Sequence, residues 1–212
     1  LVKVLVRNPQ KAKRLRKLGI SVVLGNLNQP NALDSALSGC DRLISIPPNT
    51  LNQAEQEINL FQAAKRVGIN RVVKLSTVKA DPKSTCLFFQ QHAIAEQYLK
   101  QSGLTFTILQ SNSFMQNFLW FADEIRTQGT LSLPMKDSKT APVDIGDLVN
   151  VAYKVLVEAG HEGEIYNITG SEMLSMKDIA EKLSAIASKE ITYINLPPIN
   201  FKQTLLQFGL DD

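Results

Sequence analysis

Arg71-Val72-Val73-Lys74-Leu75 opens the part of the sequence that decides the fold. This short apolar run predicts a buried strand, because the strands of a covered sheet are nearly continuous apolar segments. A helical pattern follows at residues 87–101 and ends at Ser102-Gly103, and residues 104–109 form another apolar run. A strand, a helix and a second strand in this order are typical of a βαβ unit, whose two strands are parallel.

The same alternation extends outward from this stretch. Strands are predicted at residues 2–6, 21–24 and 42–46, and helices at residues 9–18, 30–37 and 53–67. Beyond residue 110 helices are predicted at 114–125, 145–158 and 175–187, and strands at 130–133, 141–143, 164–168 and 191–194. This pattern predicts an α/β fold with a Rossmann-like doubly wound parallel sheet. We expect a single domain over residues 1–212, with a small C-terminal substrate lobe from about residue 111.

The composition is that of a globular protein. The 212 residues are 44% hydrophobic and 20% charged, which is enough for one core. No apolar run approaches the roughly 18 residues of a membrane span and no secretory leader opens the chain, so a cytoplasmic location is expected. Cys40 and Cys86 are expected to be free thiols. The basic first 20 residues fit a solvated helix face or a phosphorylated ligand, and nucleic acid is not an expected partner.

Ligands of a doubly wound sheet bind outside the carboxyl ends of its strands, so the residues just after each predicted strand are site candidates. These residues are Arg7-Asn8, Gly25-Asn26-Leu27, Ile46-Pro47-Pro48, Ser76-Thr77 and Gln110 to Asn117. No group of histidines and cysteines has the spacing of a metal site, and no Gly-x-Ser-x-Gly hydrolase motif occurs.

Several segments resemble, in the same order, the NmrA-like family of atypical short-chain dehydrogenases/reductases and its NADPH-dependent quinone reductase branch. They are Val6-Arg7-Asn8-Pro9-Gln10-Lys11-Ala12, Val73-Lys74-Leu75-Ser76-Thr77, Ser102-Gly103-Leu104-Thr105-Phe106-Thr107-Ile108-Leu109, Val143-Asp144-Ile145-Gly146-Asp147 and Gly163-Glu164-Ile165-Tyr166-Asn167-Ile168-Thr169-Gly170. Each segment is a weak signal alone, but together they cover nearly the whole chain. The resemblance implies an NAD(P)-binding Rossmann-like domain.

In that family the strand at residues 2–6 is the second strand of the sheet. The resemblance therefore implies that the first strand, its glycine-rich turn and the first helix would stand before Leu1, and that the family's last helices would follow the end of this chain. None of the 11 glycines forms a GxGxxG pattern after a strand, so the loop that holds the pyrophosphate is not among these residues. We expect a chain truncated at its N-terminus and at its C-terminus, and natural loss of the loop is the alternative.

The resemblance places the adenosine end of the dinucleotide at the ends of the first strands. Arg7 stands where an arginine accommodates the 2′-phosphate of NADP(H), with Asn8 and Lys11 beside it, and a solvated surface arginine is the alternative. The other cofactor-binding candidates at strand ends are Asn26, Leu27, Ile46 and Pro47. For Asn26, which stands near the adenine in the family, an ordinary turn residue is the alternative.

Standard short-chain dehydrogenases use a serine together with a Tyr-x-x-x-Lys pair on the following helix, and the tyrosine gives its proton to a carbonyl. By resemblance, Ser76 stands at the place of the serine, Phe88 at that of the tyrosine and His92 at that of the lysine. Phenylalanine has no proton to donate, so ordinary alcohol–ketone chemistry is not expected. Ser76 and His92 are the catalytic candidates and would hold the ribose–nicotinamide end, and a structural histidine is the alternative for His92.

The loop after residue 109 departs from the Leu-Arg-Pro of the family by having Gln110-Ser111, but Asn112 and Phe114 match family positions that line the nicotinamide side. Two interpretations fit the aromatic residues Phe114, Phe118, Trp120 and Phe121. They form either an aromatic wall for a flat substrate or a stripe of core residues. Asp144 and Asp147 flank a predicted helix start, which favours capping over a paired-carboxylate site.

The leading hypothesis is an NADP(H)-binding oxidoreductase that reduces a quinone or a similar planar acceptor by hydride transfer. The absent tyrosine supports an alternative, a non-catalytic regulator that binds the dinucleotide and acts through a protein partner. A third hypothesis is an assembly protein that no longer binds nucleotide, which natural loss of the glycine loop would favour.

Overall fold

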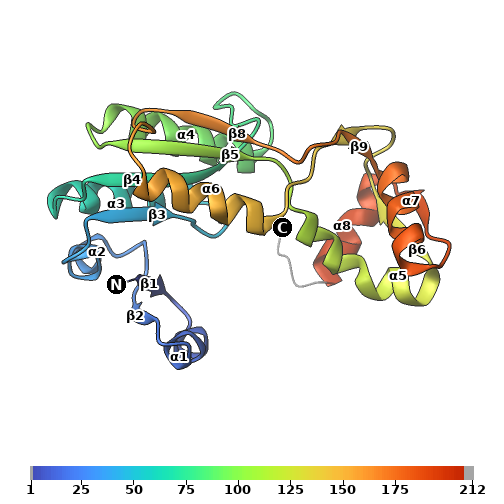
Figure 1. Cartoon of the computed structure of the whole chain (residues 1–212), viewed down its shortest axis with the longest axis horizontal. Helices are drawn as coiled ribbons and strands as arrows, with labels where there is room; N and C mark the ends of the chain where they lie inside the picture. The colour runs from blue at the N-terminus through green and yellow to red at the C-terminus, as the bar shows by residue number, and fades with distance from the viewer. Residues whose placement is uncertain (1, 208–212) are drawn as a thin grey trace. The chain divides into compact units, whose positions relative to one another are not determined.

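The computed structural model describes residues 2–207, although not the side chains of residues 204, 205 and 207 (Figure 1). The chain divides into two compact units. The first unit comprises Leu1–Ser111 and Asn150–Asn167, and the second comprises Asn112–Val149 and Ile168–Asp212. Each unit is described by itself.

The first unit alternates strands and helices along the chain. Its strands are β1 (Lys3–Val6), β2 (Ser21–Leu24), β3 (Arg42–Ser45), β4 (Arg71–Thr77), β5 (Phe106–Ser111) and β8 (Ile165–Ile168, which crosses the boundary). Its helices are α1 (Pro9–Lys17), α2 (Pro30–Leu37), α3 (Gln53–Arg66), α4 (Leu87–Gln101) and most of α6 (Ile145–Val157).

The strands of the first unit form two sheets. Strands β1 and β2 are a parallel pair in which Lys3 lies opposite Ser21. The other sheet has the order β3-β4-β5-β8. Its β3–β4 and β4–β5 pairs are parallel, with Val72 opposite Phe106 in the second pair. The predicted α/β class with parallel strands is therefore confirmed.

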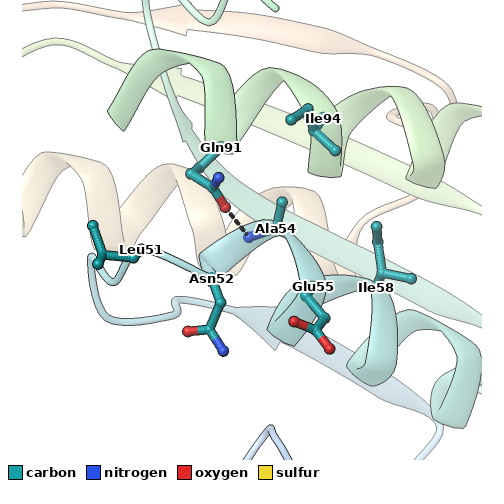
Figure 2. A pocket seen from close by; sticks show the side chains of 7 residues that line it. All are labelled: Leu51, Asn52, Ala54, Glu55, Ile58, Gln91 and Ile94. Carbon is teal, nitrogen blue, oxygen red and sulfur yellow. Dashed lines mark hydrogen bonds between the residues drawn. The ribbon is translucent and has the colours of Figure 1, made fainter. Parts of the chain in front are cut away.

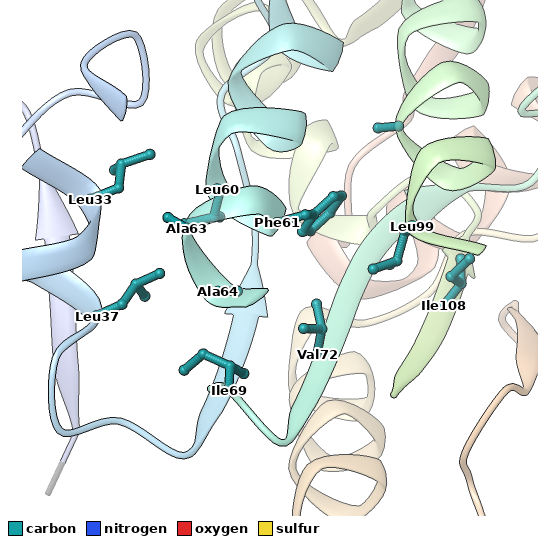
Figure 3. Close-up of a cluster of buried hydrophobic side chains, with 11 residues drawn as sticks. Leu33, Leu37, Leu60, Phe61, Ala63, Ala64, Ile69, Val72, Leu99 and Ile108 are labelled. Atoms are coloured by element: carbon teal, nitrogen blue, oxygen red, sulfur yellow. The ribbon is translucent and has the colours of Figure 1, made fainter. Parts of the chain in front are cut away.

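The core of the first unit lies between β4, β5 and the helices α2, α3 and α4 (Figure 3). Phe61 of α3 and Leu99 of α4 are fully buried there, together with Val72 and Ile108 of the sheet. Helix α3 ends at a left-handed glycine, Gly68 with φ +77°, which a side chain would strain. That turn leads the chain directly into β4.

The second unit is built from shorter elements. They are a 3-10 helix (Met115–Phe121), α5 (Ala122–Gln128), β6 (Thr130–Leu133), β7 (Lys139–Thr140), β9 (Leu174–Ser175), α7 (Met176–Ala187), β10 (Thr192–Asn195) and α8 (Pro198–Gln207). Strands β6 and β10 are parallel, and β7 and β9 are antiparallel. Ser175 and Asp178 form a reciprocal capping box at the start of α7. The core of this unit contains Phe121, Leu131 and Ile179.

Some predicted boundaries were wrong, for local reasons. Strand β5 begins at Phe106 rather than at residue 104, because the backbone N–H of Leu104 donates to the hydroxyl of Ser102 in the preceding turn. The strand predicted at 141–143 is reduced to a single bridge between Val143 and Phe114, since Pro142 has no N–H for a ladder. The helix predicted over residues 114–125 is a 3-10 helix followed by α5.

Cys40 and Cys86 are free thiols. Within residues 2–207, no helix has both the length and the apolar composition needed to cross a membrane, and no group of side chains could hold a metal ion.

Candidate active site

Strand β4 carries polar side chains near its carboxyl end, on the face that packs against helices α3 and α4. Side chains alternate along a strand, so Val72, Lys74 and Ser76 point to the same face. Val72 belongs to the core between the sheet and helices α3 and α4, and Lys74 and Ser76 are also buried. Ser45 at the end of β3 donates to the buried Glu57, and Gln110 near the end of β5 donates to the buried Glu96. These strand ends are where a doubly wound sheet presents its ligand site.

Lys74 and Glu57 form a fully buried ion pair. Both side chains are 0% exposed, and Lys74 Nζ lies 2.6 Å from Glu57 Oε2. The hydroxyl of Ser45 donates to the other carboxylate oxygen of Glu57 over 2.9 Å. Burial lowers the pKa of Lys74, because desolvation disfavours an ammonium ion, while the nearby Glu57 opposes this shift.

His92 of α4 lies against this ion pair. Its Nδ1 is 3.4 Å from Lys74 Nζ, and Gln53 Nε2 lies 3.3 Å from Nδ1 and 3.2 Å from Nε2. Phe88, one helical turn earlier, packs edge-to-face on the imidazole with ring centroids 4.7 Å apart. Burial, and then the charge of Lys74, lower the pKa of His92 to about 3. The ring is therefore neutral at physiological pH.

Ser76 contacts a second buried acid, Glu96, which lies one turn beyond His92 on α4. The Ser76 hydroxyl donates to Glu96 Oε1 over 2.5 Å, and Gln110 Nε2 donates to both carboxylate oxygens over 2.9 and 3.1 Å. Lys100, which is half-exposed, completes the set at 3.2 Å. The Gln110 amide is uncharged, so it satisfies the hydrogen-bonding capacity of the buried Glu96 carboxylate without offsetting its charge. Glu96 also helps to keep Lys74 charged, so the two groups of buried residues are electrostatically linked.

A hydrogen bond between α3 and α4 fixes where Gln53 meets His92. The backbone N–H of Ala54 donates to Gln91 Oε1 over 2.7 Å, which satisfies one amide of the first turn of α3 (Figure 2). A cavity of about 400 Å³ lies over this contact and is lined by Leu51, Asn52, Ala54, Glu55, Ile58, Gln91 and Ile94. Neither Ser76 nor His92 lines it, so it is not part of the candidate site.

The adenosine-side candidates lie at the end of β1. Asn8 caps α1, because its side-chain oxygen accepts hydrogen bonds from the backbone N–H of Gln10 at 2.8 Å and of Lys11 at 3.3 Å. Arg7 and Lys11 are exposed. Among the described residues, the guanidinium of Arg7 has no hydrogen-bond or ion-pair partner.

The other strand-end candidates follow β2 and β3 in the chain. Asn26 accepts a hydrogen bond from the backbone N–H of Asn28 over 3.0 Å, which is the arrangement of a turn residue. Leu27 packs partly against the core. Ile46, which follows β3, is 67% exposed, and the neighbouring Pro47 is half-buried. An exposed isoleucine at a strand end is available for contact with an apolar ring.

Asn112 and Phe114 belong to the second unit. Asn112 Oδ1 accepts from the Thr140 hydroxyl over 2.7 Å, and Phe114 pairs with Val143. Of the predicted aromatic group, Phe121 is buried and Phe118 packs against the core of this unit, whereas Trp120 is 57% exposed. Asp144 accepts from the backbone N–H of Gly146 over 2.7 Å, as expected of a cap.

Comparison with known proteins decides the family. The sequence profile of the NmrA-like family matches residues 1–211. The chain belongs to the NmrA-like family. The resemblance carried by the strand-end segments is thereby confirmed.

Relatives of this NmrA-like chain include reductases. An NAD(P)H azoreductase from Xenophilus azovorans is 31% identical over 210 residues, which are 99% of this chain and 73% of the relative. Quinone oxidoreductase 2 from Escherichia coli (strain K12) is 32% identical over 209 residues, which are 98% of this chain and 73% of the relative. The crystal structure of an NADPH-dependent quinone oxidoreductase from Escherichia coli in complex with NADPH matches with a TM-score of 0.85 and 31% identity, covering 99% of this chain and 74% of that one. The predicted Rossmann-like fold is confirmed.

Sequence reasoning did not find three of the ionisable residues that this NmrA-like chain buries. Lys74 stood inside an apolar run, and Glu57 and Glu96 stood on helices that carry many other polar residues. The signal available was their position: Lys74 shares its strand face with Ser76, and Glu96 follows His92 by one helical turn. A charged residue in such a place is almost never fully buried unless it is paired.

Proposed function

We propose that this chain is the dinucleotide-binding part of an NADP(H)-dependent oxidoreductase that reduces a quinone or a similar planar acceptor. The observation that carries the proposal is Arg7 at the end of β1, which is exposed and has no partner among the described residues. The relatives of the chain include NAD(P)H reductases. In this proposal Arg7 selects the phosphorylated form of the cofactor, and the buried polar groups at the ends of β4 and β5 serve the other end.

The residues around Arg7 fit a phosphate. A guanidinium binds phosphate oxygens through paired hydrogen bonds. The Arg7 guanidinium pairs with no carboxylate among the described residues, so it is available for this contact. Lys11 adds a second exposed cation on the first turn of α1. No acidic residue occurs in the first 20 residues to repel the ligand. Asn8 contributes by fixing the start of α1 rather than through its carboxamide oxygen, which the cap already uses.

Ser76 and His92 are proposed to hold the ribose–nicotinamide end. The hydrogen of the Ser76 hydroxyl is donated to Glu96, so the lone pairs of its oxygen remain to accept from a ligand hydroxyl. NADPH, when bound, supplies the hydride. His92 is neutral at pH 7 and Phe88 has no ionisable proton, so neither residue protonates the acceptor, and a quinone suits such a site because water can supply its protons. The contact of Asn112 and Phe114 with the acceptor stays a prediction.

Turnover tests the enzyme proposal directly. Full-length protein mixed with NADPH and a panel of benzoquinones and naphthoquinones is expected to consume NADPH, followed by absorbance. Tight NADPH binding without turnover of any acceptor would contradict the enzyme and support a regulator that acts through a protein partner.

Replacement of Arg7 tests the cofactor preference. Arg7→Ala is expected to weaken NADPH binding roughly 10- to 150-fold and to leave NADH binding nearly unchanged, because a charge-assisted contact contributes about 1.5–3 kcal/mol. Titration of both cofactors by calorimetry measures the ratio. Arg14→Ala, an exposed arginine on α1, is the matched control and should change neither affinity by more than about twofold. An unchanged ratio in Arg7→Ala would remove the proposed role of Arg7.

A further inference from the structure

A cation faces the imidazole of His92 from strand β4. Standard short-chain dehydrogenases carry this cation as a lysine on the helix, at the place where His92 stands in this chain. We infer that Lys74, held by Glu57, is a positioning residue that fixes His92 in the tautomer with a lone pair on Nδ1 and a hydrogen on Nε2. The inference deepens the proposed function, since it rests on His92 meeting the nicotinamide end.

The atoms around Nδ1 determine the tautomer. Lys74 Nζ, 3.4 Å from Nδ1, has hydrogens to donate and no lone pair to offer as an ammonium. Gln53 Nε2, 3.3 Å from Nδ1, is also a donor. The orientation of the Gln53 carboxamide is set by Glu57, because its nitrogen lies 3.4 Å from the carboxylate oxygen and an oxygen there would be repelled. Gln53 Nε2 is almost equally close to both ring nitrogens and does not select one of them, whereas the Lys74 ammonium contacts Nδ1, so Nδ1 accepts and the ring hydrogen is on Nε2.

Lys74 is itself held in place from all sides. The three hydrogens of its ammonium have three acceptors: Glu57 Oε2 at 2.6 Å, His92 Nδ1 at 3.4 Å and the Leu75 carbonyl at 3.5 Å. Ser45 fixes the other oxygen of Glu57. The ammonium therefore cannot turn away from the ring without losing a partner in a fully buried site, where an unmet donor is costly.

The Nε2 hydrogen of this tautomer meets no protein acceptor among the described residues. Among the described residues, the polar atom facing Nε2 is the Gln53 amide nitrogen at 3.2 Å, and an amide nitrogen does not accept a hydrogen bond. Phe88 fixes the plane of the ring by edge-to-face contact. An N–H of fixed direction suits a ligand oxygen, such as a ribose hydroxyl or a carbonyl. His92 would then act as a hydrogen-bond donor that does not change its protonation state.

The tautomer of His92 can be measured without ligand. Long-range proton–nitrogen correlation spectra of full-length protein with ¹⁵N-labelled histidine distinguish a protonated from an unprotonated ring nitrogen. The chain has two histidines, so His161→Gln assigns the signals. Wild-type protein is expected to show one neutral tautomer, with the hydrogen on Nε2, between about pH 5 and pH 8. A hydrogen on Nδ1 in wild-type protein would overturn the inference.

The double variant Lys74→Met/Glu57→Gln decides the role of Lys74. It removes both charges together, so no buried charge is left unpaired and the fold is retained. The expected result is a mixture of both tautomers, because the ammonium that faces Nδ1 is gone. Glu57→Gln alone, which leaves Lys74 without its counter-charge, should give an intermediate mixture. A single unchanged Nε2–H tautomer in the double variant would overturn the inference.

The same spectra separate this inference from the proposed function. Addition of NADPH to wild-type protein should shift the Nε2 resonance if His92 meets the nicotinamide end. If NADPH binds and the Nε2 resonance does not move, the proposed role of His92 fails, while the tautomer result for Lys74 still stands.

Discussion

Replacement of Lys74 by methionine should destabilise the first unit strongly. Methionine keeps most of the length of the lysine stem but cannot pair with Glu57, whose side chain is 0% exposed. Glu57 would retain the Ser45 hydroxyl at 2.9 Å and the Gln53 amide at 3.4 Å, and would lose the ammonium at 2.6 Å. Breaking a buried pair on one side costs about 3–5 kcal/mol, which is a large share of the roughly 5–15 kcal/mol that stabilises a typical domain.

The pH dependence of this loss identifies its cause. Burial disfavours the charged form of an unpaired carboxylate, so the folded variant takes up a proton more readily than the unfolded chain does. A group that binds a proton more tightly in the folded state adds stability at low pH, and that stability is lost as pH rises. The deficit of Lys74→Met relative to wild-type protein should therefore be largest near about pH 7 and shrink on acidification toward about pH 5.

Urea unfolding followed by far-ultraviolet circular dichroism measures the effect. Lys100→Met is the matched control, because Lys100 pairs with Glu96 from a half-exposed position at 3.2 Å. Solvent screens that pair, so its loss should cost below about 1 kcal/mol and vary little with pH. A Lys74→Met protein within about 1 kcal/mol of wild type, or a large deficit that does not change with pH, would refute the account of the buried pair.

Three further predictions concern single residues. The pKa of His92 falls from 6.5 to about 3 on folding, so the neutral ring favours the folded state fully above about pH 6.5. As pH falls below this value, the free energy of unfolding decreases by up to about 1.4 kcal/mol per pH unit. Urea titrations of His92→Asn should show a shallower acid dependence than wild type, and parallel curves would contradict this. Gly170→Ala should destabilise the second unit by about 1–3 kcal/mol or more in thermal unfolding, since a Cβ would lie 2.0 Å from the Pro142 carbonyl oxygen; an unchanged midpoint would contradict the clash. Ser175→Ala should cost about 1 kcal/mol by removing the cap on Asp178 N–H, measured by urea unfolding followed through Trp120, the single tryptophan; no loss would show that the cap is not used.

The sequence was sufficient for the elements that depend on local signals. Residues 21–24 are a short apolar run, the helix at 30–37 begins at a proline, and the helix at 87–101 ends at Ser102-Gly103; β2, α2 and α4 have these bounds. The boundaries that failed, at β5 and at residues 141–143, were set by a side-chain hydrogen bond and by a proline inside an apolar run.

The same reasoning predicted only part of the candidate site. Ser76 was found both by its position after a predicted strand and by resemblance, and His92 was found by resemblance alone. Glu57 and Glu96 were not found, since a carboxylate on a helix is normally taken to face solvent and nothing local reveals a partner on a strand. Their burial depends on Lys74, Ser76 and Gln110, which the chain brings close only in the folded sheet.

The discontinuity of the first unit has a consequence for synthesis of the chain. Strand β8, which neighbours β5 in the four-stranded sheet, comes from the segment that returns after residue 150. A nascent chain emerging from the ribosome therefore presents β5 with one bare edge until residues 165–168 have been translated. During that interval the exposed N–H and C=O groups can pair with another chain, so this stage of synthesis is the one most open to aggregation.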